Sequence, residues 1–177
     1  MSAASARVFF ALWPDDALRT ILADLAREVG RETRGRPPAA GNEHLTLAFL
    51  GEQPSGRIVA LRELAGNVGG ERFSLTLDEI GCFRRSGVAW LGSSARQSDL
   101  LALQSRLSLA LRQDGFPVDE RPYAPHLTLA RQIRASLHRS LPAPIVWDVS
   151  SFALVASELG RKGSTYHILA EWSLGAR

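Results

Sequence analysis

The sequence predicts an α+β fold made of two similar lobes that are related by approximate two-fold symmetry. The pentapeptide HLTLA occurs twice, at residues 44–48 and 126–130, and each copy follows a segment with strand and then helix character. The composition, 45% hydrophobic and 22% charged, is that of an ordinary globular protein. A chain of 177 residues also fits one folding unit. We therefore expect a single bilobal domain over residues 1–177.

The first half opens with a strand and a helix. Residues 7–12 (RVFFAL) form a short apolar run rich in β-formers, and Pro and Asp at 13–16 (WPDD) are typical of a helix start. Apolar side chains then recur at helical spacing at Leu18, Ile21, Leu22, Leu25 and Val29. Residues 30–42 carry Gly, two adjacent prolines and three arginines, which predicts a loop. The first HLTLA strand is expected to end at Gly51.

Helix and strand periodicities continue through the rest of the chain. They predict helices over residues 58–68 and 100–111, strands over 73–77 and 88–91, the second HLTLA strand, and closing strands over 149–156 and 165–172 joined by a turn at 160–163. The first half thus ends in a hairpin-like segment that contains LDEIG and GVAWLG. The second half starts at GVAWLG and ends in LVASELG and STYHILAEW.

Targeting signals and disulfides are not expected. Apolar runs stay well below the roughly 18–20 residues that span a bilayer, and the N-terminal run over residues 8–13 is too short for a signal-peptide core. These features predict a cytoplasmic protein. Cys82 is the only cysteine, so an internal disulfide is impossible and a thiolate zinc site is disfavoured.

Arginine dominates the basic residues. The net charge is only +3, but the pI is about 9.7, and Lys162 is the single lysine among 21 basic residues. Arginine is well suited to phosphate and nucleic acid, although a GC-rich genome would produce the same bias. The charge therefore permits a phosphate-bearing partner without requiring one.

The repeated motif places polar groups on one face of a strand. Side chains alternate with period two, so His44 shares a face with Thr46, and His126 shares a face with Thr128, while the leucines lie opposite. Polar side chains on that face need water or a ligand. If the lobes face each other, one cleft would hold two imidazoles and two hydroxyls.

Duplicated packing, chance and metal binding could each produce the repeat instead of a shared cleft. Duplicated packing accounts for the leucines but not for the polar face, and chance would produce such a match in fewer than about one chain in a thousand. Zinc needs three or four ligands, whereas the two motif histidines are 82 residues apart (126 − 44) and Glu43, beside the first, should point away. His138 and His167 are interpreted as surface or strand histidines.

Two histidines that face a common point suit general acid–base chemistry. Neutral and protonated imidazoles coexist near pH 7, so one can accept a proton while the other donates one. Neighbouring threonine hydroxyls can donate hydrogen bonds to anionic oxygens. Such a set fits an in-line displacement at phosphorus in which water or a ribose hydroxyl attacks.

The chain resembles the two-histidine (2H) phosphoesterase superfamily, whose mark is a pair of His-x-Thr-x motifs. Within it, the sequence is similar to the RNA 2′,3′-cyclic phosphodiesterases, historically described as 2′-5′ RNA ligases. The segments that carry the resemblance are RVFFALWPDD, NEHLTLAFLGE, VAWLG and RPYAPHLTLAR, which extend over most of the chain. The resemblance implies a bilobal fold, with an antiparallel sheet in each lobe, helices on the outside and a cleft between the lobes.

The resemblance also implies catalytic roles. His126 would be the proton acceptor that activates water, and His44 the proton donor to the departing 3′ oxygen of a 2′,3′-cyclic phosphate. Thr46 and Thr128 would hold the non-bridging phosphate oxygens. The implied product is a 2′-phosphate end, formed without a metal or another cofactor.

Further substrate contacts are expected around the motifs. The resemblance places Arg131 against the phosphate and Phe49 against a base or ribose, although strict alternation puts both on the face opposite the histidines unless the strands bulge. Arg34, Arg36 and Arg121 are candidates for RNA-backbone contacts, with solvated surface the favoured interpretation of each.

The implied enzyme is a monomer that acts on RNA with a 2′,3′-cyclic phosphate end, tRNA fragments among them. Joining such an end to a 5′-hydroxyl as a 2′-5′ linkage would use the same groups in reverse. A small cyclic nucleotide phosphate is another possible substrate. A non-catalytic RNA- or nucleotide-binding module is the alternative from a different class of protein.

Overall fold

A computed structural model describes residues 5–160 and 163–175. Its eight strands form one antiparallel sheet in the order β6-β3-β4-β5-β2-β1-β7-β8. The strands are β1 (Ser5–Leu12), β2 (Leu45–Pro54), β3 (Phe73–Phe83), β4 (Val88–Gly92), β5 (Leu127–Arg131), β6 (Arg139–Val149), β7 (Ser151–Gly160) and β8 (Gly163–Ser173). The helices are α1 (Asp16–Thr33), α2 (Ser55–Gly66) and α3 (Ser98–Gln113).

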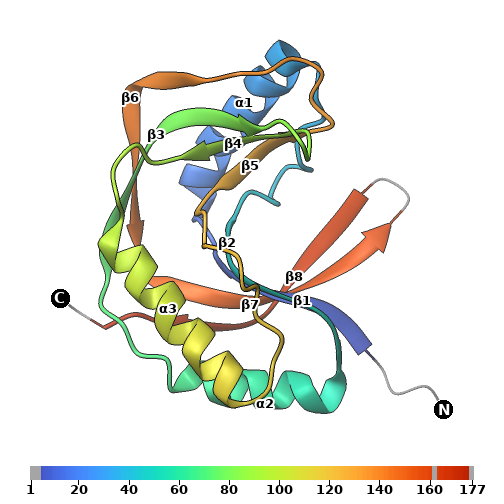
Figure 1. The fold of residues 1–177 in the computed structure, drawn as a ribbon, viewed down its shortest axis with the longest axis vertical. Coiled ribbons are helices and arrows are strands. Elements are labelled where there is room, and N and C mark those ends of the chain that lie inside the picture. The colour runs from blue at the N-terminus through green and yellow to red at the C-terminus, as the bar shows by residue number, and fades with distance from the viewer. Residues whose placement is uncertain (1–4, 161–162, 176–177) are drawn as a thin grey trace.

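The two HLTLA strands are neighbours at the centre of the sheet. β2 and β5 pair through Leu45 and Leu127, the same position of each motif. On either side of this pair lies a set of four strands, β6-β3-β4-β5 and β2-β1-β7-β8. Figure 1 shows the first set in the upper part of the molecule and the second in the lower part. The two expected lobes are therefore confirmed, and their sheets join through this single pair.

The outer strands belong to different halves from those expected. The C-terminal hairpin β7–β8 pairs with β1, whereas β3, which contains LDEIG, pairs with β4 and β6 in the other half. Local patterns predict that a strand forms but not which distant strand it meets. The apolar strand β7 is buried against β1 in the register Phe9 to Val155 and Phe10 to Leu154. Two residues of the predicted hairpin turn, 161 and 162, lie outside the described residues.

The first helix begins where the sequence predicts and ends later. The Asp15 side chain caps α1 by accepting a hydrogen bond from the Leu18 backbone N–H at 2.8 Å. The prediction that the loop starts at residue 30 is wrong, because the helix continues to Thr33. Gly30 is accommodated there because it packs against the Pro37 ring, where a Cβ would lie 3.1 Å from Cδ. Arg34 ends the helix with a left-handed φ of 53°.

Two strand predictions also need correction. β2 does not end at Gly51 but continues to Pro54, because Gly51 takes a positive φ of 69° and remains paired with Val8. β6 was not predicted, since Pro142 and Pro144 interrupt its pattern. It is an edge strand of the sheet, where the missing backbone donors are tolerated.

Different apolar clusters pack on the two faces of the sheet. One face packs with the helices into the main core, which includes Phe10, Leu22 and Leu103, so the helices lie outside the lobes as expected. The other face carries a small second apolar cluster that includes Phe9 and Val155. Consecutive residues Phe9 and Phe10 thus point to opposite faces. None of the helices among the described residues is long and apolar enough to cross a membrane.

Candidate active site

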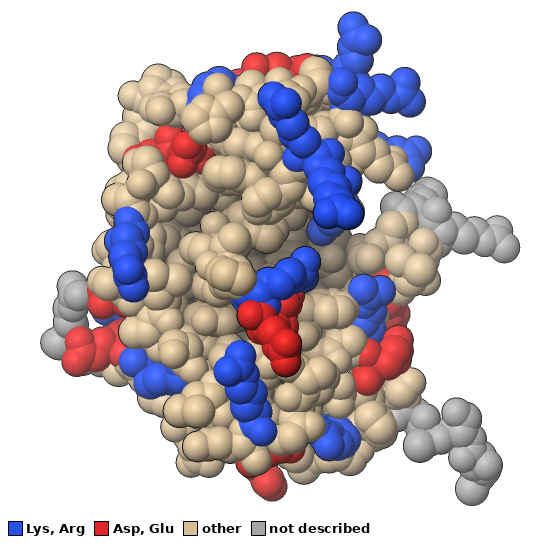
Figure 2. Space-filling view, in the orientation of Figure 1, with Lys and Arg blue, Asp and Glu red and all other residues tan. Residues whose placement is uncertain are grey.

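The central strand pair brings the two motifs together. Since Leu45 lies opposite Leu127 in antiparallel register, His44 faces Thr128 and Thr46 faces His126 on the side of the sheet away from the leucines. The two histidines lie on one diagonal of this square, where Cα atoms are typically ~7–8 Å apart. Figure 2 shows the surface hollowed near where Figure 1 draws β2 and β5, with basic side chains beside the hollow.

The His44 imidazole is fixed by two polar contacts. Nδ1 lies 2.6 Å from the carbonyl oxygen of Asn42, which can only accept, so Nδ1 carries the proton and donates it. In the neutral ring Nε2 is then an acceptor, and it accepts a hydrogen bond from the Thr46 hydroxyl at 3.1 Å. The threonine of the first motif therefore contacts the atom of His44 that would exchange a proton with a substrate.

Three aromatic rings surround the same imidazole. Trp13 stacks on it at 5.5 Å between ring centroids, Phe9 lies at 4.9 Å and the edge of Tyr166 at 5.2 Å. Burial lowers the pKa of His44 to about 4, the hydrogen bond to Asn42 opposes this effect, and the positive charges of Arg131 and His126 add to it. In the unliganded protein His44 is therefore neutral at pH 7.

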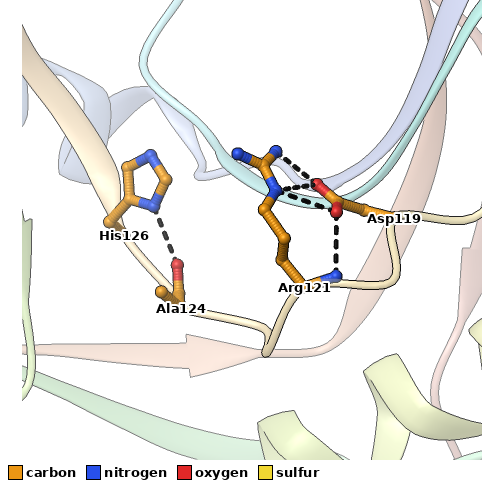
Figure 3. A network of polar contacts seen from close by, with 4 residues as sticks. All are labelled: Asp119, Arg121, Ala124 and His126. Carbon is orange, nitrogen blue, oxygen red and sulfur yellow. Dashed lines mark hydrogen bonds and ion pairs between the residues drawn. The ribbon is translucent and has the colours of Figure 1, made fainter. Parts of the chain in front are cut away.

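His126 is held by the equivalent contact in the second motif. Its Nδ1 donates to the carbonyl of Ala124, two residues earlier, at 2.8 Å (Figure 3). The Phe83 ring packs edge-on against it at 5.0 Å and also contacts Trp90. Trp90 lies so close over Gly81 that a Cβ there would fall 2.3 Å from the indole. Nε2 of His126 has no hydrogen-bond partner among the described residues, so in the neutral ring it is the nitrogen that can accept a proton.

Both motif strands contain a β-bulge at the same place. In β2, Thr46 pairs with Ala11 and Ala48 with Phe10, so Leu47 is the extra residue. In β5, Leu129 is extra in the same way. A bulge shifts the alternation by one position, so residues beyond it change face.

The bulges bring Phe49 and Arg131 to the histidine face, which corrects the expectation from strict alternation. Phe49 lies directly opposite Phe9, the residue that packs on His44, and is itself 49% exposed. Arg131 lies close enough for its charge to lower the pKa of His44. These two residues occupy the same position, five beyond the histidine, in the two motifs.

The remaining arginine candidates differ in their surroundings. Arg121 lies near His126 but is bound by Asp119, whose oxygens accept from Nε at 2.9 and 3.1 Å (Figure 3). This hydrogen bond lowers the pKa of Asp119 to about 2. Arg34 is the C-cap of α1, and Arg36 pairs through its backbone with Arg131.

The other two histidines lie apart from the site, as predicted. His138 Nε2 lies 2.8 Å from a Glu79 oxygen and His167 Nε2 lies 3.7 Å from a Glu158 oxygen, and both imidazoles are exposed. Among residues 5–160 and 163–175, His, Cys, Asp and Glu side chains do not gather in any group of three or more that could hold a metal.

Comparison with known proteins agrees with this geometry. The family model of the 2′-5′ RNA ligase superfamily matches residues 5–161. The chain belongs to this superfamily. The 2H phosphoesterase resemblance and its fold are thus confirmed, and both HLTLA copies lie within the matched residues.

Individual members of the superfamily are similar over most of their length. The chain is 41% identical over 143 residues to the RNA 2′,3′-cyclic phosphodiesterase of Escherichia coli (strain K12), covering 79% of this chain and 80% of that protein. It is 31% identical to the protein of the same name from Thermus thermophilus, covering 95% and 90%. The crystal structure of E. coli LigT in apo form superimposes with a TM-score of 0.88 at 34% identity, covering 97% and 99% of the two chains.

Sequence reasoning missed the aromatic residues around the histidines of this superfamily member. Phe9 and Trp13 could have been found, because period two in RVFFALW places them on one face. Tyr166 had no local signal, since β8 reaches the site only through its pairing with β7. Phe83 likewise depends on the pairing of β3 with β4.

Tyr123 links the two halves of this superfamily fold. Its hydroxyl, from the loop before β5, donates to the carbonyl of Thr46 in β2 at 2.8 Å, and burial raises its pKa. Tyr123→Phe leaves that carbonyl without this donor and is expected to cost about 1–2 kcal/mol in the free energy of unfolding. Urea denaturation measures the loss. A change below about 0.5 kcal/mol would show that the hydrogen bond does not stabilise the lobe junction.

Proposed function

We propose that the chain hydrolyses the 2′,3′-cyclic phosphate at the end of an RNA to a 2′-phosphate. The observation that carries this proposal is the diagonal placement of two imidazoles, each with Nδ1–H held by the carbonyl two residues earlier and Nε2 left for chemistry. The names of the relatives from E. coli and T. thermophilus support the substrate and the reaction.

The proposed reaction is a single in-line displacement. Nε2 of His126 takes a proton from water as the water oxygen bonds to phosphorus. The bond between phosphorus and the 3′ oxygen breaks on the opposite side, and Nε2 of His44 gives a proton to that oxygen. One imidazole ends protonated and the other neutral, and exchange with solvent restores both.

His44 must hold a second proton before it can act as the acid. In the free protein burial lowers its pKa, and nearby positive charges, that of Arg131 foremost, add to this effect. A bound phosphodiester anion offsets those positive charges and favours the imidazolium. Substrate binding would thus convert His44 into a proton donor whose low intrinsic pKa promotes proton transfer to the leaving oxygen.

The remaining site residues would bind and orient the substrate. The hydroxyls of Thr46 and Thr128 can donate to the non-bridging oxygens, where charge increases during attack. Arg131 would add a charged contact to the phosphate. Phe49, with the Arg7 guanidinium 4.8 Å from its ring centroid, would stack on a base.

The direct test is incubation with a short RNA that ends in a 2′,3′-cyclic phosphate, in the presence of EDTA. We expect a 2′-phosphate product at an unchanged rate, because imidazoles, hydroxyls and Arg131 supply proton transfer and charge stabilisation without a metal. Chromatography resolves cyclic, 2′-phosphate and 3′-phosphate ends. Loss of activity in EDTA with recovery on adding a divalent metal would contradict the mechanism.

Other products would identify the rival functions. A 2′-5′ linkage formed with a 5′-hydroxyl RNA would show ligation, which the same groups catalyse by microscopic reversibility. Turnover of a small cyclic nucleotide alone would exclude RNA as the preferred substrate. Binding of the RNA end without any turnover would show a binding module.

The oligomeric state, the cellular location and the type of RNA also belong to the proposal. One bilobal domain over residues 1–177 would act as a monomer, since a single chain supplies both motifs, which meet at one strand pair. Cytoplasmic RNA such as a tRNA fragment would be a suitable substrate for a protein with one cysteine and 21 basic residues. Light scattering of the purified protein tests the monomer.

A further inference from the structure

Arg36 lies beside Arg131 on the histidine face of the sheet. The two residues exchange backbone hydrogen bonds of 2.7 and 2.8 Å, from Arg36 N–H to Arg131 O and from Arg131 N–H to Arg36 O. Residues that pair in this way project their side chains to the same face. Gly35 permits the close approach, because a Cβ there would lie 3.0 Å from the Arg131 carbonyl oxygen and 2.8 Å from Ile133.

This arrangement places two positive charges directly opposite each other, which is unfavourable in a sheet. Neither Arg36 nor Arg131 has an acidic partner among the described residues. Other arginines of the chain do: Arg121 is bound by Asp119, and Arg139 contacts Glu28 at 2.6 Å. An anion between the Arg36 and Arg131 guanidinium groups would relieve the repulsion, and a phosphate accepts the bidentate hydrogen bonds that guanidinium offers.

The surface next to Arg36 is also basic. A depression at the end of α1 lies against the two chain neighbours of Arg36 and is lined by Arg27, Gly30, Arg31, Arg34, Gly35 and Pro37. Figure 2 shows Lys and Arg side chains gathered at the upper right, where Figure 1 draws the end of α1. Because Gly35 and Pro37 alternate with Arg36, this depression lies on the α1 side of the segment, and its arginines add positive charge near the site without being part of the subsite itself.

We infer that Arg36, together with Arg131, binds the phosphodiester that precedes the terminal nucleotide of the RNA. This inference rests on the proposed function. If the 3′ oxygen departs toward His44, the ribose lies on the His44 side of the phosphorus, and the bulge at Leu129 turns Arg131 to this same face of the sheet. The 5′ side of the nucleotide then extends over Arg131 toward Arg36. The subsite makes the enzyme select an oligonucleotide end over a free cyclic mononucleotide.

The test compares two substrates that differ by one phosphodiester. One is a dinucleotide that ends in a 2′,3′-cyclic phosphate, and the other is a nucleoside 2′,3′-cyclic phosphate with a free 5′-hydroxyl. The ratio of kcat/KM for the two should fall about 10- to 100-fold in Arg36→Gln, the range expected for a lost charge-assisted contact. Arg112→Gln, which removes the same charge from the exposed end of α3, should leave the ratio unchanged.

Binding provides a readout that does not depend on turnover. The dinucleotide 2′-phosphate should bind the wild type more tightly than the nucleoside 2′-phosphate, and Arg36→Gln should remove this difference and reduce the salt slope by about 0.7. Thermal melting confirms that the variant folds. An equal effect on both substrates and both ligands, or no effect, would overturn the subsite. Absence of turnover by the wild type, with the binding difference intact, would instead contradict the proposed hydrolysis.

Discussion

Replacing either motif histidine by alanine is expected to lower kcat on a cyclic-phosphate RNA end by about 10²–10⁴-fold, the usual contribution of one general acid or base. His126→Ala removes the unbonded Nε2 that takes the proton from water, and His44→Ala removes the group that protonates the 3′ oxygen. The double variant should fall little further than either single variant, because the two groups act in one displacement. Single-turnover rates measure these effects.

The chain supplies matched controls for this experiment. His138→Ala and His167→Ala remove exposed histidines that contact Glu79 and Glu158 and should retain wild-type rates. Circular dichroism and thermal melting of all five variants separate loss of chemistry from loss of fold. A near wild-type rate in either His44→Ala or His126→Ala would exclude the paired acid–base mechanism.

Acidification is expected to destabilise the protein through His44. The pKa is about 4 in the folded protein and about 6.5 in an unfolded chain. Between these values the unfolded state binds more protons, so the free energy of unfolding decreases as the pH falls from about 6.5 to 4. The full contribution of this group is on the order of 3 kcal/mol. Urea denaturation at pH 7, 5.5 and 4.5 measures it.

His44→Gln is the control, because glutamine does not titrate. Its free energy of unfolding should fall less steeply over the same pH range, while His138→Gln should follow the wild type. NMR titration of the His44 ring should give a pKa near 4 in the free protein, which rises when inorganic phosphate binds. Parallel pH profiles for the wild type and His44→Gln would show that the aromatic rings around His44 do not hold a neutral imidazole.

Much of the fold and the pairing of the two motif histidines could be predicted from the sequence alone. Residues 7–12 and 100–111 show strand and helix periods that need no distant partner, and the structure has β1 and α3 there. The repeated HLTLA places a His and a Thr on the polar face of each strand, because alternation is a local property of the backbone. Two identical polar faces in one chain then predict a shared site.

Only the tertiary structure decided which residues join that site. Which distant strand pairs with β1 or β4 depends on burial across the whole sheet, so the positions of Tyr166 and Phe83 around the histidines had no local signal. The face to which a side chain points beyond a bulge also depends on how the strand pairs with its neighbouring strands. Extra residues at Leu47 and Leu129 turn Phe49 and Arg131 to the histidine face.

Arg36 shows the same division between local and distant information. The Gly-, Pro- and Arg-rich segment around it predicts an exposed loop arginine, and Arg36 is exposed. Its bridge partner Arg131, however, lies 95 residues further along the sequence (131 − 36). Most of the strands, the three helices and the two His-Thr pairs could be predicted from local patterns, because each depends on a short segment, whereas the proline-interrupted strand β6 could not. The aromatic rings around His44, the two bulges and the pairing of Arg36 with Arg131 could not be predicted in this way, because they require contacts between distant segments that only the folded sheet brings together.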